Sequence, residues 1–226
     1  MSKEEPLSPQ NWDNKKKDEL FKFIYKGLTG WLQDSGHKQI TRWLRPDKNC
    51  CRLELGIGQG HHLRQRTRRL KGYHGLDNNF HNLKKVKTQF RKLDLVAADA
   101  SDLPFANGSF NRVIAIYLLE HLDKLDQTMR EVNRLLMDNG DFLVALPAEG
   151  GLLYKIGREF TTKRYMEKKF NIDYDAVIKA SHVNEYPQIV EKLLNYFKIE
   201  KVAYLPFRFL PTFHFNAFVC IWARKK

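Results

Sequence analysis

The chain is 226 residues long, carries a formal net charge of +13 and is 42% hydrophobic. That length and composition are typical of a single domain with a sizeable buried core. The sequence has no run of 18 apolar residues, which excludes a conventional membrane-spanning helix. The polar N-terminus lacks the apolar core of a secretory signal, so we expect a cytoplasmic protein. Three cysteines, two of them adjacent, fit neither a disulfide framework nor a paired-cysteine metal site, and we expect no metal.

The positive charge is concentrated in residues 50–98 and 151–226, whereas residues 99–150 are acidic. A basic surface can attract nucleic acid, an anionic membrane or a small acidic substrate. Much of the first basic block falls on two expected helices, where a solvated outer face is the usual explanation. The charge alone leaves all three classes of partner open.

Residues 1–49 are predicted to be an arm followed by covering helices. Two prolines and a polar composition indicate that residues 1–14 are loosely held. Apolar residues then recur at helical spacing from Lys15 to Leu44, with a second short helix expected to start near Ile40 and to end before Pro46. These helices either pack on the domain or also cover one side of a ligand cleft.

From residue 50 onward, short apolar runs alternate with amphipathic segments, which predicts a parallel sheet with helices on both faces. The predicted strands are Cys51–Leu55, Tyr73–Leu76, Leu95–Ala98, Arg112–Tyr117 and Asp141–Leu146, and the predicted helices are His61–Leu70, Asn82–Leu93 and Lys124–Met137. Right-handed crossovers bring the carboxyl ends of such strands to one edge, where ligands of parallel sheets bind.

The pattern changes after Pro147. Residues 148–184 are rich in aromatic and basic residues without strand alternation, and we expect a substrate-side insertion there. Glu185–Phe197 is predicted to be a helix. Two further strands, Lys201–Leu210 and Phe213–Ala223, are predicted to pair antiparallel.

Three alternating glycines follow the first predicted strand, in the sequence Glu54-Leu-Gly-Ile-Gly-Gln-Gly60. Glycine tolerates positive φ and has no Cβ, so a strand can turn sharply here and let a ligand approach the backbone. No Gly-Lys-Ser/Thr follows, and the dinucleotide-binding spacing G-x-G-x-x-G is not matched either. The remaining pattern, E-x-G-x-G-x-G, resembles motif I of the class I S-adenosylmethionine-dependent methyltransferases.

The resemblance covers residues 50–147. The segment ending at Asp77 resembles the second strand of that family, whose terminal acid can accept hydrogen bonds from both ribose hydroxyls. Ala98–Phe105 resembles the family signature D-A-x-x-L-P-F, whose first aspartate, here Asp99, faces the adenine. Phe110–Leu146 resembles the block F-D-x-V … L-E-H-L … E-x-x-R-x-L-x-P-G-G, with an asparagine for the first aspartate and Asp-Asn for Pro-Gly. The block is most similar to the methyltransferase type 11 group, related to quinone-biosynthesis enzymes.

The resemblance implies a Rossmann-like α/β fold over residues 50–226, with a seven-stranded, mostly parallel sheet closed by an antiparallel hairpin. It also implies S-adenosyl-L-methionine as the methyl donor and S-adenosyl-L-homocysteine as the product. The residues that it assigns to the cofactor are Glu54, Gly56, Gly58, Gly60, Asp77, Asn78, Asp99, Ala100 and Tyr117.

A general base is needed only if the acceptor keeps its proton, and the sequence does not single one out. His61, Tyr117 and His121 are weak candidates by placement; for His121 a role in capping or packing is the stronger alternative.

Three residues of the 148–184 segment, Tyr154, Arg158 and Arg164, are candidate acceptor-binding residues. Arginines and aromatics beside a cleft suit an anionic, lipid-linked or sugar-linked acceptor. A solvated helix with its side-chain stems packed along the surface explains them equally well.

The leading hypothesis is therefore a methyltransferase for a small-molecule acceptor. An RNA methyltransferase or RNA-binding protein is the first alternative, prompted by the charge. It is disfavoured because Tyr117-Leu-Leu-Glu120 stands where amino-methyltransferases acting on bases carry N/D-P-P-Y. A catalytically silent, methyltransferase-like partner is the second alternative. Peripheral membrane contact and the oligomeric state stay open.

Overall fold

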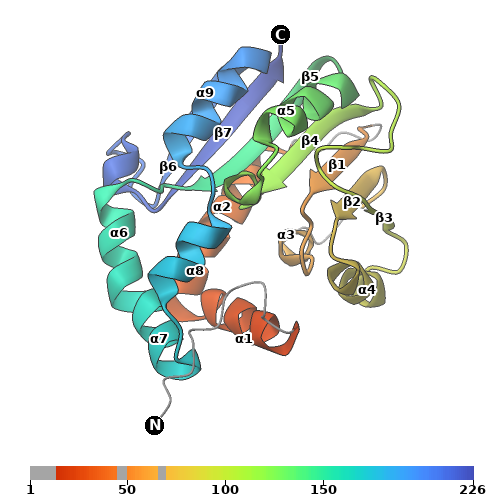
Figure 1. Ribbon diagram of the computed structural model, residues 1–226. Helices are drawn as coiled ribbons and strands as arrows, with labels where there is room; N and C mark the ends of the chain where they lie inside the picture. Colours follow the sequence, from red (N-terminus) through yellow and green to blue (C-terminus); the bar gives the residue numbers. More distant parts are fainter. Residues whose placement is uncertain (1–13, 45–49, 66–69) are drawn as a thin grey trace.

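The computed structural model describes residues 14–44, 50–65 and 70–226. They include a seven-stranded sheet of order β3-β2-β1-β4-β5-β7-β6, with helices on both faces (Figure 1). The first five strands pair in parallel, β7 is antiparallel to β5, and β6 is antiparallel to β7. The strands are β1 (Arg52–Leu55), β2 (Tyr73–Asp77), β3 (Asp94–Ala97), β4 (Phe110–Ile116), β5 (Leu136–Pro147), β6 (Phe197–Leu205) and β7 (Phe218–Lys225). The predicted Rossmann-like fold with a C-terminal antiparallel hairpin is confirmed.

The helices fill the intervals that the amphipathic segments predicted, and they also occupy the segment after β5. They are α1 (Asn14–Ile24), α2 (Gly27–Trp43), α3 (His61–Arg64), α4 (Phe80–Gln89), α5 (Leu125–Leu135), α6 (Leu152–Arg158), α7 (Arg164–Phe170), α8 (Tyr174–Ser181) and α9 (Tyr186–Tyr196). Three single-turn segments complete the described elements: η2 (Leu119–His121), η3 (Glu159–Lys163) and η4 (Phe213–Phe215).

The sheet separates two apolar layers, because successive residues of a strand point to opposite faces. In β5, Val144 and Leu146 pack toward α5 and α9, whereas Leu143 and Ala145 pack toward α2. The helices α3 and α4 lie on the same side as α2. Both faces of the central strands are thus covered, which explains the uninterrupted apolar runs at residues 113–116 in β4 and 142–146 in β5.

The N-terminal helices are divided at a different point from the one predicted. The chain breaks before Gly27, which has a positive φ of +56°, and α2 then runs without interruption past Ile40 to Trp43. Glycine adopts this left-handed backbone without the steric cost of a Cβ, so the break falls at the glycine and not near Ile40. The predicted loose arm, residues 1–14, lies outside the described residues except for Asn14, which begins α1, and most of the predicted continuation of α3 also lies outside them.

Two boundaries in the C-terminal hairpin also differ. The strand β6 begins at Phe197, where the predicted helix was expected to end, and residues Phe213–Phe215 form the turn η4 before β7 begins at Phe218. Within the described residues, no helix is long and apolar enough to cross a bilayer.

The parallel strands end together at one edge of the sheet. Leu55 of β1 lies opposite Leu76 of β2 and Ala115 of β4, and Asp77 lies opposite Ala97 of β3. The chain leaves all four strands at this edge, so the loops that follow them are neighbours. The loop after β1 and the ends of β2, β3 and β4 therefore meet as predicted.

Candidate cofactor and acceptor site

The loop after β1 passes through three left-handed glycines, of which Gly56 (φ +61°) and Gly58 (φ +54°) face different surroundings. A Cβ on Gly56 would lie 2.7 Å from Cδ1 of Leu118, so this position is packed against the end of β4. A Cβ on Gly58 would meet, among the described residues, no atom closer than the Gly56 carbonyl oxygen at 4.0 Å. Gly58 thus offers bare backbone to a ligand, as motif I requires.

Asp77 joins this loop to the end of β2. Its Oδ2 accepts a 2.8 Å hydrogen bond from the Gly58 amide, and its Oδ1 accepts from the Asn79 amide at 2.8 Å and from Nδ2 of Asn82 at 3.3 Å. The neighbouring Asn78 is exposed. A carboxylate offers about four acceptor positions, so Asp77 can brace the loop and still accept a ribose hydroxyl.

Glu54 lies beneath the loop and not at its surface. Its Oε2 accepts a 2.5 Å hydrogen bond from the Tyr73 hydroxyl and lies 3.3 Å from Nδ1 of His62. Nε2 of His62 in turn lies 3.1 Å from the Thr41 hydroxyl of α2. This buried network ties β1, β2 and α3 to the N-terminal helices, which gives Glu54 a positioning role under motif I.

The loop after β3 is shaped by Asp99, whose Oδ1 accepts hydrogen bonds from both the amide and the hydroxyl of Ser101, each at 2.7 Å. These bonds lower the pKa of Asp99, so its carboxylate is charged at neutral pH. Ala100 between them is buried. The turn leaves the Asp99 side chain exposed at the same edge as Asp77.

The helix α2 forms a wall against the end of β4. Tyr117 has a positive φ of +54°, and its hydroxyl donates to the Gln33 carbonyl of α2 at 2.9 Å. The ring of His37, also on α2, meets Tyr117 edge-on at 5.4 Å, and its Nε2 lies 3.0 Å from the Tyr25 hydroxyl. Burial raises the pKa of Tyr117 well above its usual value and lowers that of His37 well below its own. Both side chains are therefore neutral near pH 7.

His61, a candidate base, is engaged by the same wall. Its Nε2 lies 2.6 Å from Oδ1 of Asp34, and the ring of Tyr25 stacks on it at 3.6 Å. Burial lowers the pKa of His61, although the Asp34 carboxylate opposes this shift. The Asp34 carboxylate at Nε2 and the Tyr25 ring stacked on the imidazole give His61 a fixed position at the start of α3.

Helix α1 crosses the glycine loop and α4. Oδ1 of Asp18 accepts a 2.7 Å hydrogen bond from Nε2 of Gln59, inside motif I, and forms an ion pair with Lys85 of α4. The hydrogen bond from Lys85 is the largest cause of the lowered pKa of Asp18. The first helix thus contacts the loop through Asp18, and that the N-terminal segment covers one side of the site stays a prediction.

A second group of titratable side chains lies beyond Tyr117, where β4 and β5 end. Nδ1 of His182 lies 2.5 Å from Oε1 of Glu149, and the ring of His121 meets that of His182 edge-on at 4.5 Å. Nδ1 of His121 donates to the Ser181 carbonyl at 2.7 Å, which leaves its Nε2 without a proton when the ring is neutral. The Val183 amide donates to the Glu120 carbonyl at 2.9 Å and so holds this segment beside η2.

Glu120 is the least compensated group of this region. Its side chain is 3% exposed, and among the described residues its Oε2 has no hydrogen-bond partner. The pKa of Glu120 is raised to about 8, mainly by burial and to a smaller extent by the nearby Glu149, while a backbone hydrogen bond and His182 oppose the shift. A carboxyl group in such a site is mostly protonated at neutral pH and can donate a hydrogen bond.

The three predicted acceptor-binding residues are divided between two surfaces. Tyr154 packs on the core, and burial raises the pKa of its hydroxyl well above the usual value. The guanidinium of Arg158 lies over the Tyr174 ring and 3.6 Å from Oδ1 of Asp175, and its buried Nε has no hydrogen-bond partner among the described residues. Arg164 is exposed and lies over the ring of Phe160. Only Tyr154 and Arg158 therefore lie on the side of the Glu120 group.

Sequence reasoning missed Glu149, His182 and the polar residues of α2. Glu149 could have been found, because it follows the end of β5 at the same edge as Asp77. His182 has no such signal, since it reaches the site through the helical segment after β5. No group of three or more His, Cys, Asp or Glu side chains within the described ranges is arranged to hold a metal ion.

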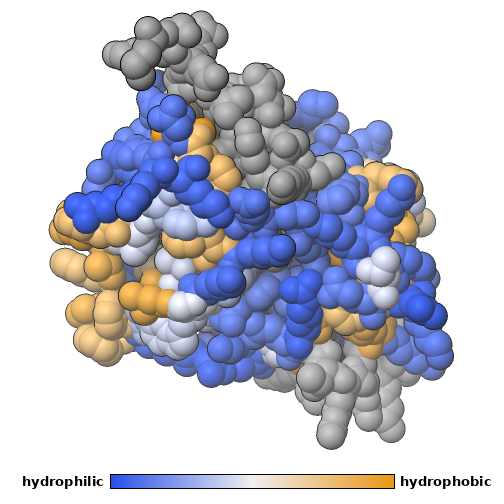
Figure 2. Space-filling model, turned by 90° about the horizontal axis from the view of Figure 1, so that it is seen from below, coloured by the Kyte–Doolittle hydropathy of each residue, from blue (hydrophilic) through white to orange (hydrophobic). Residues whose placement is uncertain are grey.

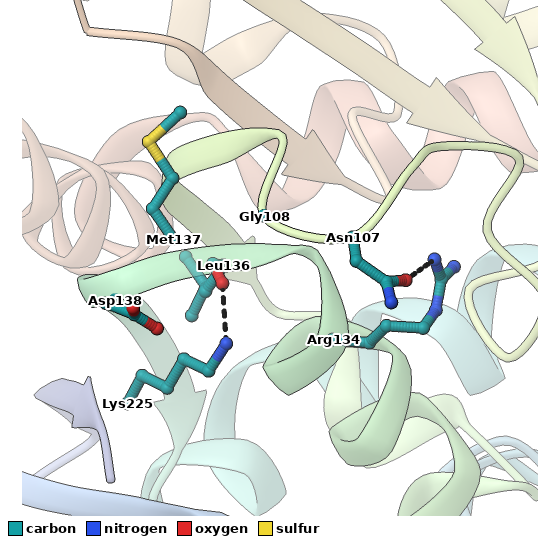
Figure 3. A pocket seen from close by; sticks show the side chains of 7 residues that line it. All are labelled: Asn107, Gly108, Arg134, Leu136, Met137, Asp138 and Lys225. Atoms are coloured by element: carbon teal, nitrogen blue, oxygen red, sulfur yellow. Dashed lines mark hydrogen bonds between the residues drawn. The ribbon is translucent and has the colours of Figure 1, made fainter.

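A surface hollow lies at the opposite edge of the sheet, between the loop before β4, the start of β5 and the end of β7 (Figure 3). Arg134 donates there to Oδ1 of Asn107 at 2.9 Å, and the Lys225 ammonium donates to the Leu136 carbonyl at 2.8 Å. Arg134 also pairs with Glu131, which accepts from the Leu103 amide. The E-x-x-R motif therefore fixes the chain before β4, and this hollow is not the cofactor site.

The central part of the chain is similar in sequence to known proteins. A family model described as a methyltransferase domain (Methyltransf_11) matches residues 53–144. An uncharacterized protein of Methanocaldococcus jannaschii is 37% identical over 92 residues, which cover 40% of this chain and 34% of that protein. Methyltransferase GfsG of Streptomyces halstedii is 31% identical over 102 residues, covering 42% and 32% of the two chains. The matched part thus spans about a third of these two relatives.

Solved structures share the fold over nearly the whole chain. A methyltransferase of Thermotoga maritima, described as S-adenosylmethionine-dependent and as a possible histamine N-methyltransferase, has a TM-score of 0.64 at 17% identity and covers 94% of both chains. The methyltransferase in a complex with the Haloferax volcanii Trm112 activator has a TM-score of 0.61 at 14% identity, again over 94% of both chains. A Mesorhizobium loti S-adenosylmethionine-dependent methyltransferase has a TM-score of 0.61 at 16% identity and covers 85% of this chain and 100% of its own.

Proposed function

We propose that this chain is a class I S-adenosylmethionine-dependent methyltransferase and that it methylates a small-molecule acceptor at the edge of the sheet. The observation that carries the proposal is the arrangement of polar groups around Tyr117. Leu118, the residue after Tyr117, packs against Gly56 of the cofactor loop, and Glu120 lies near Glu149 and His182. A donor site and an enclosed set of ionisable groups are thereby adjacent, as methyl transfer to a bound molecule requires.

The cofactor side fits S-adenosyl-L-methionine in the chemistry of its donor set. Gly58 presents bare backbone, Asp77 can accept from ribose hydroxyls, and the charged Asp99 can accept from an amino group. When bound, the cofactor supplies a methyl group on a positively charged sulfonium, and the protein supplies orientation. Gly56, Gly60, Asn78, Ala100 and Tyr117 line the same edge, whereas Glu54 acts through Tyr73 and His62.

The acceptor side offers a proton acceptor, the pair formed by Glu149 and His182. The short contact between the carboxylate and Nδ1 places the ring proton on that nitrogen, so Nε2 keeps a lone pair. A carboxylate that holds an imidazole in one tautomer also stabilises the protonated ring. His182 is therefore a stronger candidate for the general base than His61, whose Nε2 is bound to Asp34 of α2, or Tyr117, whose hydroxyl is bound to the Gln33 carbonyl of α2. Tyr154 and Arg158 are proposed to contact the acceptor.

The small-molecule proposal is supported over the RNA alternative by the partners of the basic residues. Lys85 on α4 pairs with Asp18, and Lys163 pairs with Glu159 and Asp175. Ammonium groups engaged in this way are less available to phosphates. Arg66 and Arg69, which the RNA alternative would also use, lie outside the described residues.

The experiment that tests the function is a screen with methyl-labelled S-adenosyl-L-methionine against a metabolite fraction and, separately, total RNA. We expect labelled product in the small-molecule fraction. Label in RNA would favour the first alternative. Binding of S-adenosyl-L-homocysteine without transfer to any fraction would favour a silent partner.

If the small-molecule fraction is labelled, Arg158→Ala is expected to weaken acceptor binding by roughly ten- to hundred-fold while leaving cofactor affinity unchanged, because one charge-assisted contact contributes about 1.5–3 kcal/mol. Arg164→Ala, on the outer surface, is the matched control.

A further inference from the structure

An apolar surface lies on α6, η3 and the connection between β6 and β7, which we call the apolar face. Its exposed side chains are Leu152, Ile156, Phe160, Phe207, Phe209 and Phe215. Two phenylalanines are the most exposed of these, Phe209 at 78% and Phe160 at 60%. In the view of Figure 2 hydrophobic residues gather along one side of the molecule, bordered by hydrophilic ones. Contiguous exposed apolar surface of this kind marks an interaction site more often than a free surface.

The helical part of the apolar face is a regular stripe. Leu152, Ile156 and Phe160 are four residues apart on the segment that runs from α6 into η3, so they share one side of the helix. That side faces solvent, while Tyr154 packs on the core. An amphipathic helix normally turns its apolar stripe toward the domain, and here the stripe points outward.

The two parts of the apolar face adjoin. Gly151, at the start of α6, is packed so closely against η4 that a Cβ there would lie 2.5 Å from the Phe213 carbonyl oxygen. The connection that carries Phe207, Phe209 and Phe215 therefore continues from the amino end of the stripe.

Basic side chains border this face. Lys155 and Arg208 are exposed, and the Arg164 guanidinium lies 4.8 Å from the centre of the Phe160 ring. The acidic Glu159 in the same helical segment pairs with Lys163 at 3.1 Å, and Lys163 also pairs with Asp175 at 2.7 Å. Exposed phenyl rings and leucines flanked by lysine and arginine are the combination that binds the interface of an anionic bilayer.

We propose that the apolar face docks on an anionic lipid surface, with the phenyl rings inserted among the acyl chains and the basic side chains against the headgroups. A second copy of this chain is disfavoured as the occupant, because it would bring the same basic border and a net charge of +13 to the contact. Docking does not depend on methyl transfer. The consequence of docking for catalysis does rest on the proposed function. The side of α6 opposite the apolar stripe carries Tyr154 and Arg158, which are proposed to contact the acceptor. A docked enzyme would therefore hold its acceptor site close to the bilayer, where a lipid-linked acceptor is available.

The test is co-sedimentation of the full chain with phosphatidylcholine vesicles and with vesicles containing about one third phosphatidylglycerol. We expect binding to the anionic vesicles that weakens with salt, and little binding to the neutral ones. The double variant Phe160→Ser, Phe209→Ser should bind at least about tenfold less, because insertion scales with buried apolar area. Lys155→Glu with Arg164→Glu should lower binding to anionic vesicles by a similar factor.

Phe80→Ser is the matched control. Phe80 is 61% exposed and lies under Lys84 at 4.9 Å, as Phe160 lies under Arg164, but it belongs to α4. This variant should bind vesicles like the unaltered protein. Equal loss in the control, or no binding to anionic vesicles, overturns the proposal. A dimer in light scattering that Phe209→Ser dissociates would assign the face to a second copy instead. Calorimetry with S-adenosyl-L-homocysteine on the same samples reports separately on the proposed function.

Discussion

The backbone amide of Gly58 donates a 2.8 Å hydrogen bond to Oδ2 of Asp77. One carboxylate at the end of β2 therefore fixes the conformation of the glycine loop that follows β1. The residue proposed to bind the ribose and the loop proposed to receive the cofactor are thus parts of one unit. A substitution of Asp77 therefore has two effects at once: it removes the proposed contact with the ribose, and it loosens the glycine loop.

Asp77→Ala is expected to weaken S-adenosyl-L-homocysteine binding by roughly thirty-fold or more, because lost charge-assisted hydrogen bonds cost about 2–4 kcal/mol. Isothermal calorimetry measures the affinity, and circular dichroism checks the fold. Asp94→Asn, at the exposed start of β3, is the control and should bind normally. Unchanged affinity in a folded Asp77→Ala protein would show that the ribose lies elsewhere.

The first two glycines of the loop, Gly56 and Gly58, should respond differently to substitution by alanine. Gly58→Ala adds a methyl group where the described residues leave space. It should therefore lower the free energy of unfolding by only about 1 kcal/mol, through backbone strain, but reduce cofactor affinity strongly. In Gly56→Ala the added methyl group also collides with Leu118, so the free energy of unfolding should fall by about 2–4 kcal/mol. Urea unfolding and calorimetry separate the two effects. Equal cofactor affinity in Gly58→Ala and the unaltered protein would refute the assignment of its backbone to the ligand.

Glu120 makes stability depend on pH. Its pKa is about 8 in the folded chain and near 4.5 when unfolded, so the folded state holds a proton that the unfolded state has released between these values. The stability that this proton contributes is present below about pH 4.5 and is lost as the pH rises toward 8. Because one pKa unit corresponds to 1.36 kcal/mol, the loss is on the order of a few kcal/mol. Glu120→Gln should therefore flatten the fall in unfolding free energy between pH 5 and pH 8.

The control for this measurement is Glu191→Gln on the exposed side of α9, which should leave the pH dependence unaltered. Denaturant unfolding at pH 5, 6, 7 and 8 supplies the free energies. A Glu120→Gln protein that loses stability as steeply as the unaltered chain would mean that Glu120 titrates normally and is not the uncompensated group of the site.

The Glu149–His182 pair should be needed for transfer to an acceptor that keeps its proton. His182→Gln is expected to lower kcat by roughly 10²–10⁴-fold, the usual contribution of a general base, with little change in S-adenosyl-L-homocysteine affinity. Glu149→Gln should lower kcat less, since the imidazole remains. Turnover is measured with the fraction that the labelled screen identifies, and exposed His214→Gln is the control. Full activity of His182→Gln would indicate an acceptor that arrives deprotonated.

The sequence alone predicted the sheet, its five parallel strands and the hairpin, and it predicted that the glycine loop, Asp77, Asp99 and Tyr117 would share one edge. These features follow from local pattern and chain order: an apolar run is a strand wherever it packs, and right-handed crossovers bring the strand ends together. The division between α1 and α2 was misjudged because helical periodicity continues across Gly27, and only its backbone conformation shows the break.

The tertiary structure decided what lies opposite the cofactor loop. Glu149 and His182 are 33 residues apart, and they meet because helices after β5 fold back over the strand ends. The stripe of Leu152, Ile156 and Phe160 has the same spacing as a buried helix face, so its sequence could not reveal that it faces solvent. Periodicity shows which residues share a side of a helix. Which side is buried depends on packing between segments distant in the chain, and that packing is not encoded in any local pattern.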